Sequence, residues 1–275
     1  MSRSPWAPAG GASNGEVVLP TATDGPAGPE PVAPRALAER LARAPRPMLL
    51  ACDVDGTLAP LAPTPPEAQL EEGALDALTD LANRGLAVAI VSGRTRDELV
   101  NHFGLPPHLH LVGSHGAELG RGAKPDEHEA AIVEHVTREL VRIAALHEGA
   151  RVEAKPFAAA LHVRGCAPDV GAEAILAVRR LYAWDERVRL LGGHAVIEVA
   201  ASPSSKSLAV ATLRDQLRPV SVVFVGDDLA DEAVFATLRD PDIGIKVGNG
   251  DTAASARLTS PEQVVAMLAA LAELV

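Results

Sequence analysis

The chain has 275 residues, of which 47% are hydrophobic and 22% are charged, so it is not disordered throughout and has enough apolar side chains for two domain cores. Asp and Glu outnumber Lys and Arg by 36 to 25, and the formal net charge of −11 argues against general nucleic-acid binding, because the chain would repel phosphates. The two cysteines, Cys52 and Cys166, are too few for a disulfide framework and favour a reducing, cytoplasmic location.

The beginning of the chain differs in composition from the rest. Residues 1–33 are rich in Pro, Gly, Ala and Ser and show neither helical nor strand periodicity, which predicts a disordered tail. The first residues lack the basic start and apolar block of a signal peptide. No apolar run reaches the roughly 18 to 20 residues of a membrane-spanning helix, so we expect no membrane partner.

Strands and helices then alternate along the chain. Apolar runs predict buried strands at 48–52, 86–91 and 109–112, and helical spacing predicts helices at 36–42, 71–83 and 96–103. The alternation returns near the C-terminus, with helices at 206–217, 230–238 and 261–274 and strands at 221–225 and 243–247. This order predicts an α/β fold, with a doubly wound, mostly parallel sheet covered by helices on both faces.

The middle of the chain has a different pattern. We expect helices at 130–146 and 169–184, a hairpin at 152–164, and strand-like runs at 188–191 and 195–199. Such a helix-plus-antiparallel insertion in an α/β domain predicts a second, smaller domain. The expected organisation is therefore a tail at 1–33, a core formed by 34–117 and 200–275, and an α+β cap at 118–199.

Acidic side chains follow two of the predicted strands. Asp53 and Asp55 come directly after the first strand, and Asp227 and Asp228 follow a strand near the C-terminus. Ligands of a doubly wound sheet bind beyond the carboxyl ends of its strands, so these acids should share one edge. Carboxylates at this density repel one another and suit Mg²⁺. Asp231, at the start of a predicted helix, is also compatible with helix capping.

Three further groups at this edge suit a phosphate. Ser92 and Gly93 precede a predicted helix, so their hydroxyl and N–H groups can hold an anion. Lys206 stands near a helix start, where its charge opposes the helix dipole by roughly 0.3–1 kcal/mol, which favours a functional role. Together these groups predict phosphoryl transfer: Asp53 would attack phosphorus, and Asp55 would protonate the leaving oxygen and then deprotonate water.

These motifs occur in the order found in the haloacid dehalogenase superfamily of phosphatases. They are Asp53-Val54-Asp55-Gly56-Thr57, Ser92-Gly93-Arg94, Lys206, and Gly226-Asp227-Asp228 followed by Asp231-Glu232. More narrowly, residues 46–273 resemble the trehalose-6-phosphate phosphatase family. The segments that carry this narrower resemblance are Gly113-Ser114-His115-Gly116-Ala117-Glu118, Glu153-Ala154-Lys155, Leu161-His162-Val163-Arg164 and Ile197-Glu198-Val199.

The resemblance implies a Mg²⁺-dependent phosphatase that hydrolyses a sugar phosphate, foremost trehalose 6-phosphate, through an aspartyl phosphate. The implied roles are catalysis for Asp53 and Asp55, phosphate binding for Thr57, Ser92, Gly93 and Lys206, substrate binding for His115, Lys155, His162, Arg164 and Glu198, and metal binding for Asp53, Asp55, Asp227 and Asp228.

The cap strands and two departures from the family pattern bear on the substrate. Alternation places Lys155 on the same strand face as Glu153, and His162 on the same face as Arg164; this fits a platform for sugar hydroxyls or a solvated sheet face. Ala200-Ala201 stands where the family usually has Arg-Pro, and Ser207 where it usually has Gly. A related phosphorylated disaccharide or pseudo-disaccharide therefore remains open.

Three other functions compete with this interpretation. A signalling receiver also uses paired acids, a hydroxyl, a lysine and Mg²⁺, but it is compact, whereas about eighty residues interrupt this sheet. Retention of the acids and the lysine disfavours a sugar-phosphate sensor without catalysis. A sugar phosphomutase, or another sugar phosphatase of the superfamily, would share the same motifs. The sequence predicts no oligomeric state.

Overall fold

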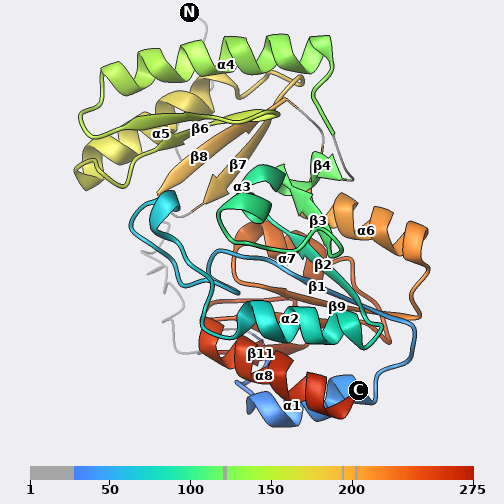
Figure 1. Cartoon of the computed structure of the whole chain (residues 1–275). Helices are drawn as coiled ribbons and strands as arrows, with labels where there is room; N and C mark the ends of the chain where they lie inside the picture. The colour runs from blue at the N-terminus through green and yellow to red at the C-terminus, as the bar shows by residue number, and fades with distance from the viewer. Residues whose placement is uncertain (1–27, 120–122, 194, 202–203) are drawn as a thin grey trace, which may run out of the picture.

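A computed structural model describes residues 28–119, 123–193, 195–201 and 204–275. These residues form two sheets, one above the other in Figure 1. The larger has the strand order β11-β10-β9-β1-β2-β3-β4, with every pair parallel except β3 and β4. Its strands are β1 (Met48–Cys52), β2 (Ala87–Val91), β3 (His110–Gly113), β4 (Glu118–Leu119), β9 (Ser221–Gly226), β10 (Ile243–Val247) and β11 (Ala256–Leu258).

Helices cover both faces of the larger sheet. Alternate residues of β1 point to opposite faces, with Leu50 in one apolar cluster and Leu49 in the other. The Leu50 cluster contains residues of α1 (Pro34–Ala42), α2 (Ala74–Asn83), α3 (Arg96–Asn101) and α8 (Pro261–Leu274). The Leu49 cluster contains residues of α6 (Lys206–Leu217) and α7 (Leu229–Phe235). Burial on both faces explains why the central strands are continuous apolar runs.

The smaller sheet is antiparallel, with the order β5-β6-β8-β7. Its strands are β5 (Arg151–Ala154), β6 (Ala158–His162), β7 (Arg189–Gly193) and β8 (Val196–Ala200). Leu161 and Val199 pack on one face with α4 (Glu127–Ala145) and α5 (Pro168–Leu181). Residues in the alternate positions, such as Ala160 and its partner Glu198, therefore lie on the opposite face.

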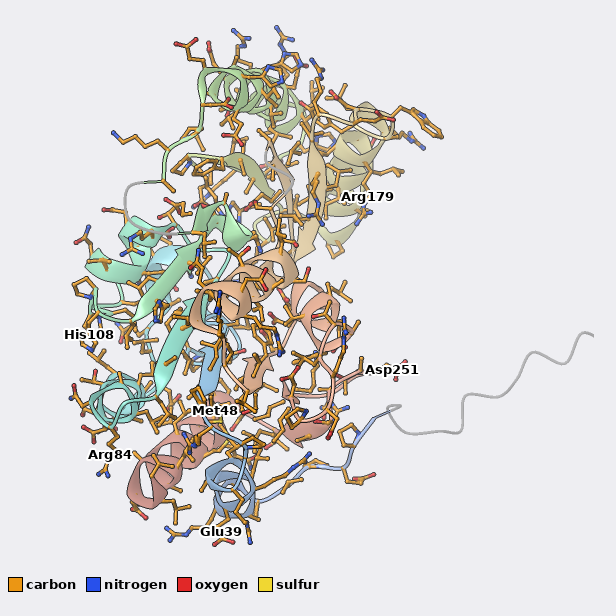
Figure 2. All side chains as sticks on the ribbon, turned by 90° about the vertical axis from the view of Figure 1, so that its right-hand side faces the viewer. Glu39, Met48, Arg84, His108, Arg179 and Asp251 are labelled. Carbon is orange, nitrogen blue, oxygen red and sulfur yellow. The ribbon has the colours of Figure 1, made fainter. Side chains whose placement is uncertain are left out.

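Two views show how the cap sits on the core. Glu39 of α1 and Arg84 after α2 mark one end of the molecule, and Arg179 of α5 lies toward the other (Figure 2). In Figure 1, α4 covers the side of the small sheet away from the larger one. No helix within the described ranges is long and apolar enough to cross a membrane.

The predicted fold class is confirmed, and each strand and helix predicted within the described residues is present within a few residues of its expected bounds. We did not predict β4, β11 or the short 3₁₀ turns at Pro65–Glu67 (η1) and Ser114–Gly116 (η2). Because β4 pairs with β3 and Ala201 packs in the cap core, we propose that the cap begins after Leu119 and ends at Ala201, instead of spanning 118–199.

The expected tail at 1–33 extends too far. Residues 1–27 lie outside the described residues, but residues 29–32 contact the core. The Val32 N–H donates to the Arg257 carbonyl at 3.0 Å, and Arg257 Nε donates to the Pro29 carbonyl at 3.0 Å. Only 2% of Arg257 is exposed. The prediction was wrong for this segment because hydrogen bonds between its backbone and a buried arginine leave no periodicity in the sequence.

Candidate active site

The central strands end together, and this brings three acids to one edge of the larger sheet. Cys52 of β1 pairs with both Ile90 of β2 and Val225 of β9, so the residues after these strands are neighbours. The carboxylates of Asp53, Asp227 and Asp231 have oxygens within 4.8 Å of one another. Predicted ligands Asp53 and Asp227 thus meet as expected, whereas the Asp55 and Asp228 side chains are not in this cluster.

A buried lysine lies against the acidic cluster. Lys206 Nζ is 2.6 Å from Asp53 Oδ2 and 2.8 Å from Asp231 Oδ1, and only 2% of Lys206 is exposed. Asp228 Oδ1 lies further away, at 3.7 Å from the same nitrogen. Lys206 begins α6, whose N-cap is Ser205, so the helix fixes its position. One ammonium group among these carboxylates leaves the cluster negatively charged.

Asp231 organises the turn that carries Asp227. Its Oδ2 accepts hydrogen bonds from the N–H groups of Asp227 at 2.9 Å and Asp228 at 3.0 Å. Asp228 is the N-cap of α7, and its Oδ1 accepts from the Asp231 N–H at 3.0 Å. Reciprocal capping therefore occupies Oδ1 of Asp228. The capping alternative raised for Asp231 is correct as well, but its second carboxylate oxygen also binds Lys206.

Burial perturbs the charges of this cluster. It is the main reason that the pKa values of Asp227 and Asp231 are raised, to about 7 and about 6, and neighbouring carboxylates raise them further. Burial also raises the pKa of Asp53 well above its usual range, although Lys206 opposes this. For Lys206, burial lowers the pKa, but Asp231 and Asp53 outweigh it and the pKa is raised. Crowded carboxylates that resist ionisation fit a divalent cation.

Two residues after β1 shape the space around Asp227. Gly56 has φ +78°, and a Cβ there would lie 2.1 Å from Asp227 Oδ2, so only glycine fits. Thr57 is fully buried, and its hydroxyl donates to Asp227 Oδ1 at 3.4 Å. The predicted phosphate-binding residue Thr57 thus contacts a carboxylate of the cluster.

The loop after β2 carries the predicted phosphate groups Ser92 and Gly93. The Ser92 N–H donates to the Val112 carbonyl at 3.0 Å, and its hydroxyl accepts from the Arg94 N–H at 3.2 Å. Gly93 packs closely against His115, because a Cβ at Gly93 would lie 2.6 Å from His115 Nε2. A side chain at position 93 would therefore displace His115.

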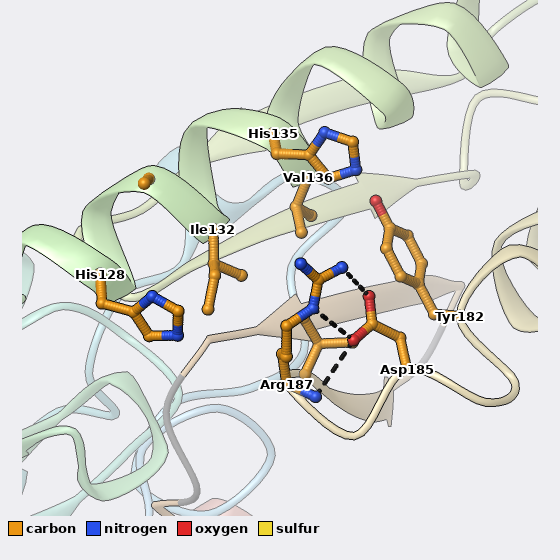
Figure 3. Close-up of a pocket in the computed structure, with 9 residues that line it drawn as sticks. His128, Ile132, His135, Val136, Tyr182, Asp185 and Arg187 are labelled. Atoms are coloured by element: carbon orange, nitrogen blue, oxygen red, sulfur yellow. Dashed lines mark hydrogen bonds and ion pairs between the residues drawn. The ribbon is translucent and has the colours of Figure 1, made fainter.

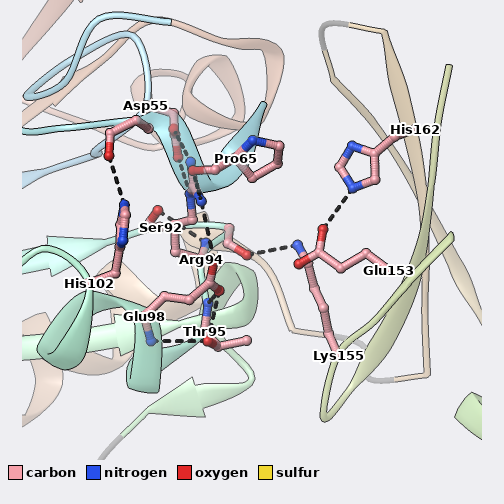
Figure 4. Close-up of polar contacts among 12 residues, drawn as sticks. Asp55, Pro65, Ser92, Arg94, Thr95, Glu98, His102, Glu153, Lys155 and His162 are labelled. Atoms are coloured by element: carbon pink, nitrogen blue, oxygen red, sulfur yellow. Dashed lines mark hydrogen bonds and ion pairs between the residues drawn. The ribbon is translucent and has the colours of Figure 1, made fainter. Parts of the chain in front are cut away.

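Arg94 holds both oxygens of Asp55, a contact that we did not predict. Arg94 Nε and Nη2 donate to the two carboxylate oxygens at 2.7 Å each. The guanidinium also donates to Glu98 at 3.2 Å and to the Pro65 carbonyl at 2.9 Å (Figure 4). Asp55 is thus directed toward α3 and Arg94.

Cap residues reach the core through Lys155 and Glu198. Lys155 Nζ donates to Glu198 at 2.6 Å. It also donates to the Gly93 carbonyl at 3.1 Å, and Figure 4 shows Lys155 reaching toward the core loop that carries Ser92 and Arg94. His115 Nε2 lies 3.9 Å from Glu198 Oε1. Burial lowers the pKa of His115 to about 4, so its imidazole is neutral at pH 7. Within the described ranges, its Nδ1 has no hydrogen-bond partner.

The other two predicted substrate residues lie outside this contact. His162 pairs with Glu153 on the neighbouring cap strand at 2.7 Å (Figure 4). Arg164 donates to the Ala62 carbonyl of the core. The structure therefore brings His115, Lys155 and Glu198 together near Gly93, and places His162 and Arg164 elsewhere on the cap–core boundary.

The cap also contains a cavity of about 190 Å³ between α4 and the residues after α5 (Figure 3). Ile132 and Val136 line it, together with Tyr182, whose hydroxyl has no hydrogen-bond partner among the described residues. It contains none of the predicted site residues. Because α4 packs on the face opposite to Glu198, this cavity is separate from the acidic edge.

Comparison with known proteins supports one family. The model of the family "Trehalose-phosphatase" matches residues 51–262. The chain belongs to this family. It is 34% identical over 220 residues to a trehalose-6-phosphate phosphatase of Escherichia coli, a match that covers 77% of this chain and 82% of that protein. The predicted family is confirmed, and with it the phosphatase class of hydrolase.

Two further relatives extend the comparison. An uncharacterised glycosyl hydrolase of Mycobacterium tuberculosis is 35% identical over 242 residues, which cover 80% of this chain but 18% of that longer protein. The C-terminal domain of a Candida albicans trehalose-6-phosphate phosphatase superposes with a TM-score of 0.76 at 23% identity, covering 93% of this chain and 100% of that one. At this identity the structural likeness supports the fold.

Proposed function

We propose that this protein is a Mg²⁺-dependent phosphatase that hydrolyses trehalose 6-phosphate to trehalose and phosphate. The observation that carries the proposal is the position of Asp53: its carboxylate lies 2.6 Å from the buried Lys206 and within an acidic cluster, at the edge where the central strands end. The choice of trehalose 6-phosphate as the substrate follows the name of a relative, a trehalose-6-phosphate phosphatase. The free cysteines Cys52 and Cys166 accord with a cytoplasmic location.

Asp53 acts as the nucleophile in this proposal. One of its oxygens bonds to phosphorus while the bond between phosphorus and the sugar oxygen breaks, and Asp55 supplies the proton that the sugar oxygen needs. Water then attacks the phosphorus of the aspartyl phosphate and gives its proton to Asp55. Phosphate leaves, and the Asp53 carboxylate and the Asp55 acid are restored.

Cations and N–H groups would stabilise the charge of the transferring phosphoryl group. Lys206 contacts Asp53 directly, so its ammonium lies beside any phosphate that Asp53 attacks. Ser92 and Gly93 would add hydroxyl and N–H donors. The Asp53 and Asp227 carboxylates and the Asp55 carbonyl would hold Mg²⁺, with Asp228 or Asp231 adjacent. Bound Mg²⁺ supplies further positive charge to the phosphoryl oxygens.

Acid–base catalysis by Asp55 requires a change in its contact with Arg94. Each Asp55 oxygen accepts a hydrogen bond from Arg94 at 2.7 Å, so at least one of these bonds must break for Asp55 to take up a proton from solvent and deliver it to the sugar oxygen. The observed arrangement is therefore a resting arrangement of Asp55. Arg94 is itself fixed by Glu98 and the Pro65 carbonyl, so the Asp55 side chain must supply the movement.

The cap would bind the sugar. Lys155 and Glu198 form a buried ion pair that meets the core at Gly93, next to the phosphate loop. His115 would add a polar group beside this pair, and His162 and Arg164 would contribute from elsewhere on the cap–core boundary. Position 200 is an alanine that lies between Ala158 on one neighbouring strand and Arg189 on the other.

A phosphate-release screen tests the proposal. The wild-type protein with Mg²⁺ should release phosphate from trehalose 6-phosphate faster than from sucrose, mannose or glucose phosphates. Faster release from another of these sugar phosphates would change the proposed substrate but leave the proposed reaction unchanged. Formation of an isomer would indicate a mutase, and binding without turnover would indicate a sensor.

A further inference from the structure

A second buried lysine lies behind the acidic cluster. Lys246 is on β10, directly opposite Gly226 of β9, and only 5% of it is exposed. Its Nζ donates to the backbone carbonyl of Asp227 and lies 3.5 Å from Glu232 Oε1. Within the described residues, Lys246 is the one charged group that contacts the Asp227 carbonyl. In the sequence, Lys246 is notable because it is a charged residue inside an otherwise apolar strand, Ile243–Val247.

Lys246 and Asp231 hold the Asp227 backbone from opposite directions. The Asp227 N–H donates to Asp231 Oδ2 at 2.9 Å, and the Asp227 carbonyl accepts from Lys246. Asp231 can approach this closely because Gly226 has no Cβ; one would lie 2.3 Å from Asp231 Cγ. The peptide groups on both sides of Asp227 are therefore fixed, and its carboxylate is directed toward Thr57 and Gly56.

Glu232 in turn holds Lys246. Its Oε1 is buried without a hydrogen-bond partner in the described part of the chain, and it faces Lys246. Its Oε2 accepts from the Ala253 N–H at 2.9 Å. Glu232 thus connects Lys246 to α7 and to the loop after β10. A lysine held on two sides can fix the carbonyl it contacts, because its long stem has little freedom left.

We propose that Lys246 is a positioning residue for Mg²⁺ binding, which acts through the Asp227 carbonyl to direct the Asp227 carboxylate into the metal site. The inference rests on the proposed magnesium site. Lys246 does not contact Asp53 in the structure. Its positive charge alone would oppose a cation, whereas its geometric role would favour one, so the two roles predict opposite changes in Mg²⁺ affinity when the lysine is removed.

The test measures the Mg²⁺ dissociation constant by calorimetry on the full chain without substrate. Lys246→Met combined with Glu232→Gln removes one charge of each sign, so no unpaired buried carboxylate remains, the net charge beside the metal site is unchanged, and the variant tests the geometric role. We expect the dissociation constant to rise roughly 10–100-fold, the usual effect of losing such a supporting contact. Turnover of this variant should return as Mg²⁺ is raised. A dissociation constant that is unchanged or lower would overturn the inference.

Controls separate this inference from the proposed function. Lys124→Met removes an exposed cap lysine and should leave Mg²⁺ affinity unchanged. Asp227→Asn should abolish binding. If the wild type binds no Mg²⁺, the metal site and this inference both fail; if it binds but Lys246 has no effect, only the inference fails. Should the double variant not fold, Lys246→Gln, whose amide is one atom shorter, should give the same rise, and an unchanged constant would again overturn the inference.

Discussion

Replacement of Lys206 by methionine examines the charge balance of the site. Methionine keeps an apolar stem but leaves Asp53 and Asp231, at 2.6 and 2.8 Å from the lost ammonium, without their cation. Breaking a buried ion pair by removing one partner costs about 3–5 kcal/mol. For a chain of this size each kcal/mol corresponds to roughly 2–4 °C, so Tm should fall by about 6–20 °C at pH 8 without metal.

The loss should depend on pH and on Asp231. At lower pH the buried carboxyls of Asp53 and Asp231, which have lost their cation, take up protons, so the destabilisation should shrink between pH 8 and pH 5. The double variant Lys206→Met with Asp231→Asn should be more stable than Lys206→Met alone, because it has one uncompensated buried charge fewer. Turnover should be lost in both variants, whereas Lys124→Met should behave as wild type in both measurements.

Thermal unfolding followed by circular dichroism measures these shifts, and phosphate release measures turnover. A Tm for Lys206→Met within about 2 °C of wild type at pH 8, equivalent to at most about 1 kcal/mol, would refute the reasoning. It would mean that the acids do not depend on Lys206 for charge compensation. Retained turnover would refute the assignment of Lys206 to the phosphate.

Three further predictions concern acid–base catalysis, metal binding and the cap. Asp55→Asn should lower kcat on the order of 10²–10⁴-fold with the fold retained, and a smaller loss would contradict its acid–base role. The pKa values of Asp227 and Asp231 are raised to about 7 and about 6, so the folded protein without metal holds protons that the unfolded chain has lost, and its stability should fall as pH rises from about 4 to 7. Mg²⁺ must displace these protons, so it should bind more tightly and release fewer protons at pH 8 than at pH 6. Calorimetry in buffers of different ionisation enthalpy measures the Mg²⁺ affinity and the number of protons released, and equal affinity at both pH values would contradict the prediction. Glu198→Ala and Lys155→Ala should each lower kcat/KM for trehalose 6-phosphate about tenfold to a hundredfold but scarcely change para-nitrophenyl phosphate hydrolysis; equal losses on both esters would show that these side chains support the fold.

The sequence was most informative where side chains repeat with a clear period. The runs at Met48–Cys52 and Ile243–Val247 and the helices at Lys206–Leu217 and Pro261–Leu274 were predicted at their observed bounds. Strand β11 was missed because Ala256–Leu258 is only three residues long and contains an arginine. Burial of that arginine depends on carbonyls elsewhere in the chain, which no local pattern reveals.

The sequence predicted which residues form the candidate site better than it predicted which of them contact one another. Asp53 and Asp227 meet because parallel strands end together, a consequence of fold class, and Lys206 reaches Asp53 from the start of α6. The pairing of Asp55 with Arg94 joins residues 39 positions apart and depends on the path of the loop after β2. Sequence position alone left open whether Asp231 caps a helix or belongs to the acidic site, and in the structure one of its oxygens accepts from the turn N–H groups while the other contacts Lys206.

The central claim is that Asp53 is the nucleophile of a trehalose 6-phosphate phosphatase. The most direct measurement is phosphate release from trehalose 6-phosphate with Mg²⁺, by wild type and by Asp53→Asn, with circular dichroism showing that the variant is folded. An amide in place of the carboxylate should remove turnover and leave the fold intact. Phosphate release by folded Asp53→Asn at a rate near that of wild type would contradict the account.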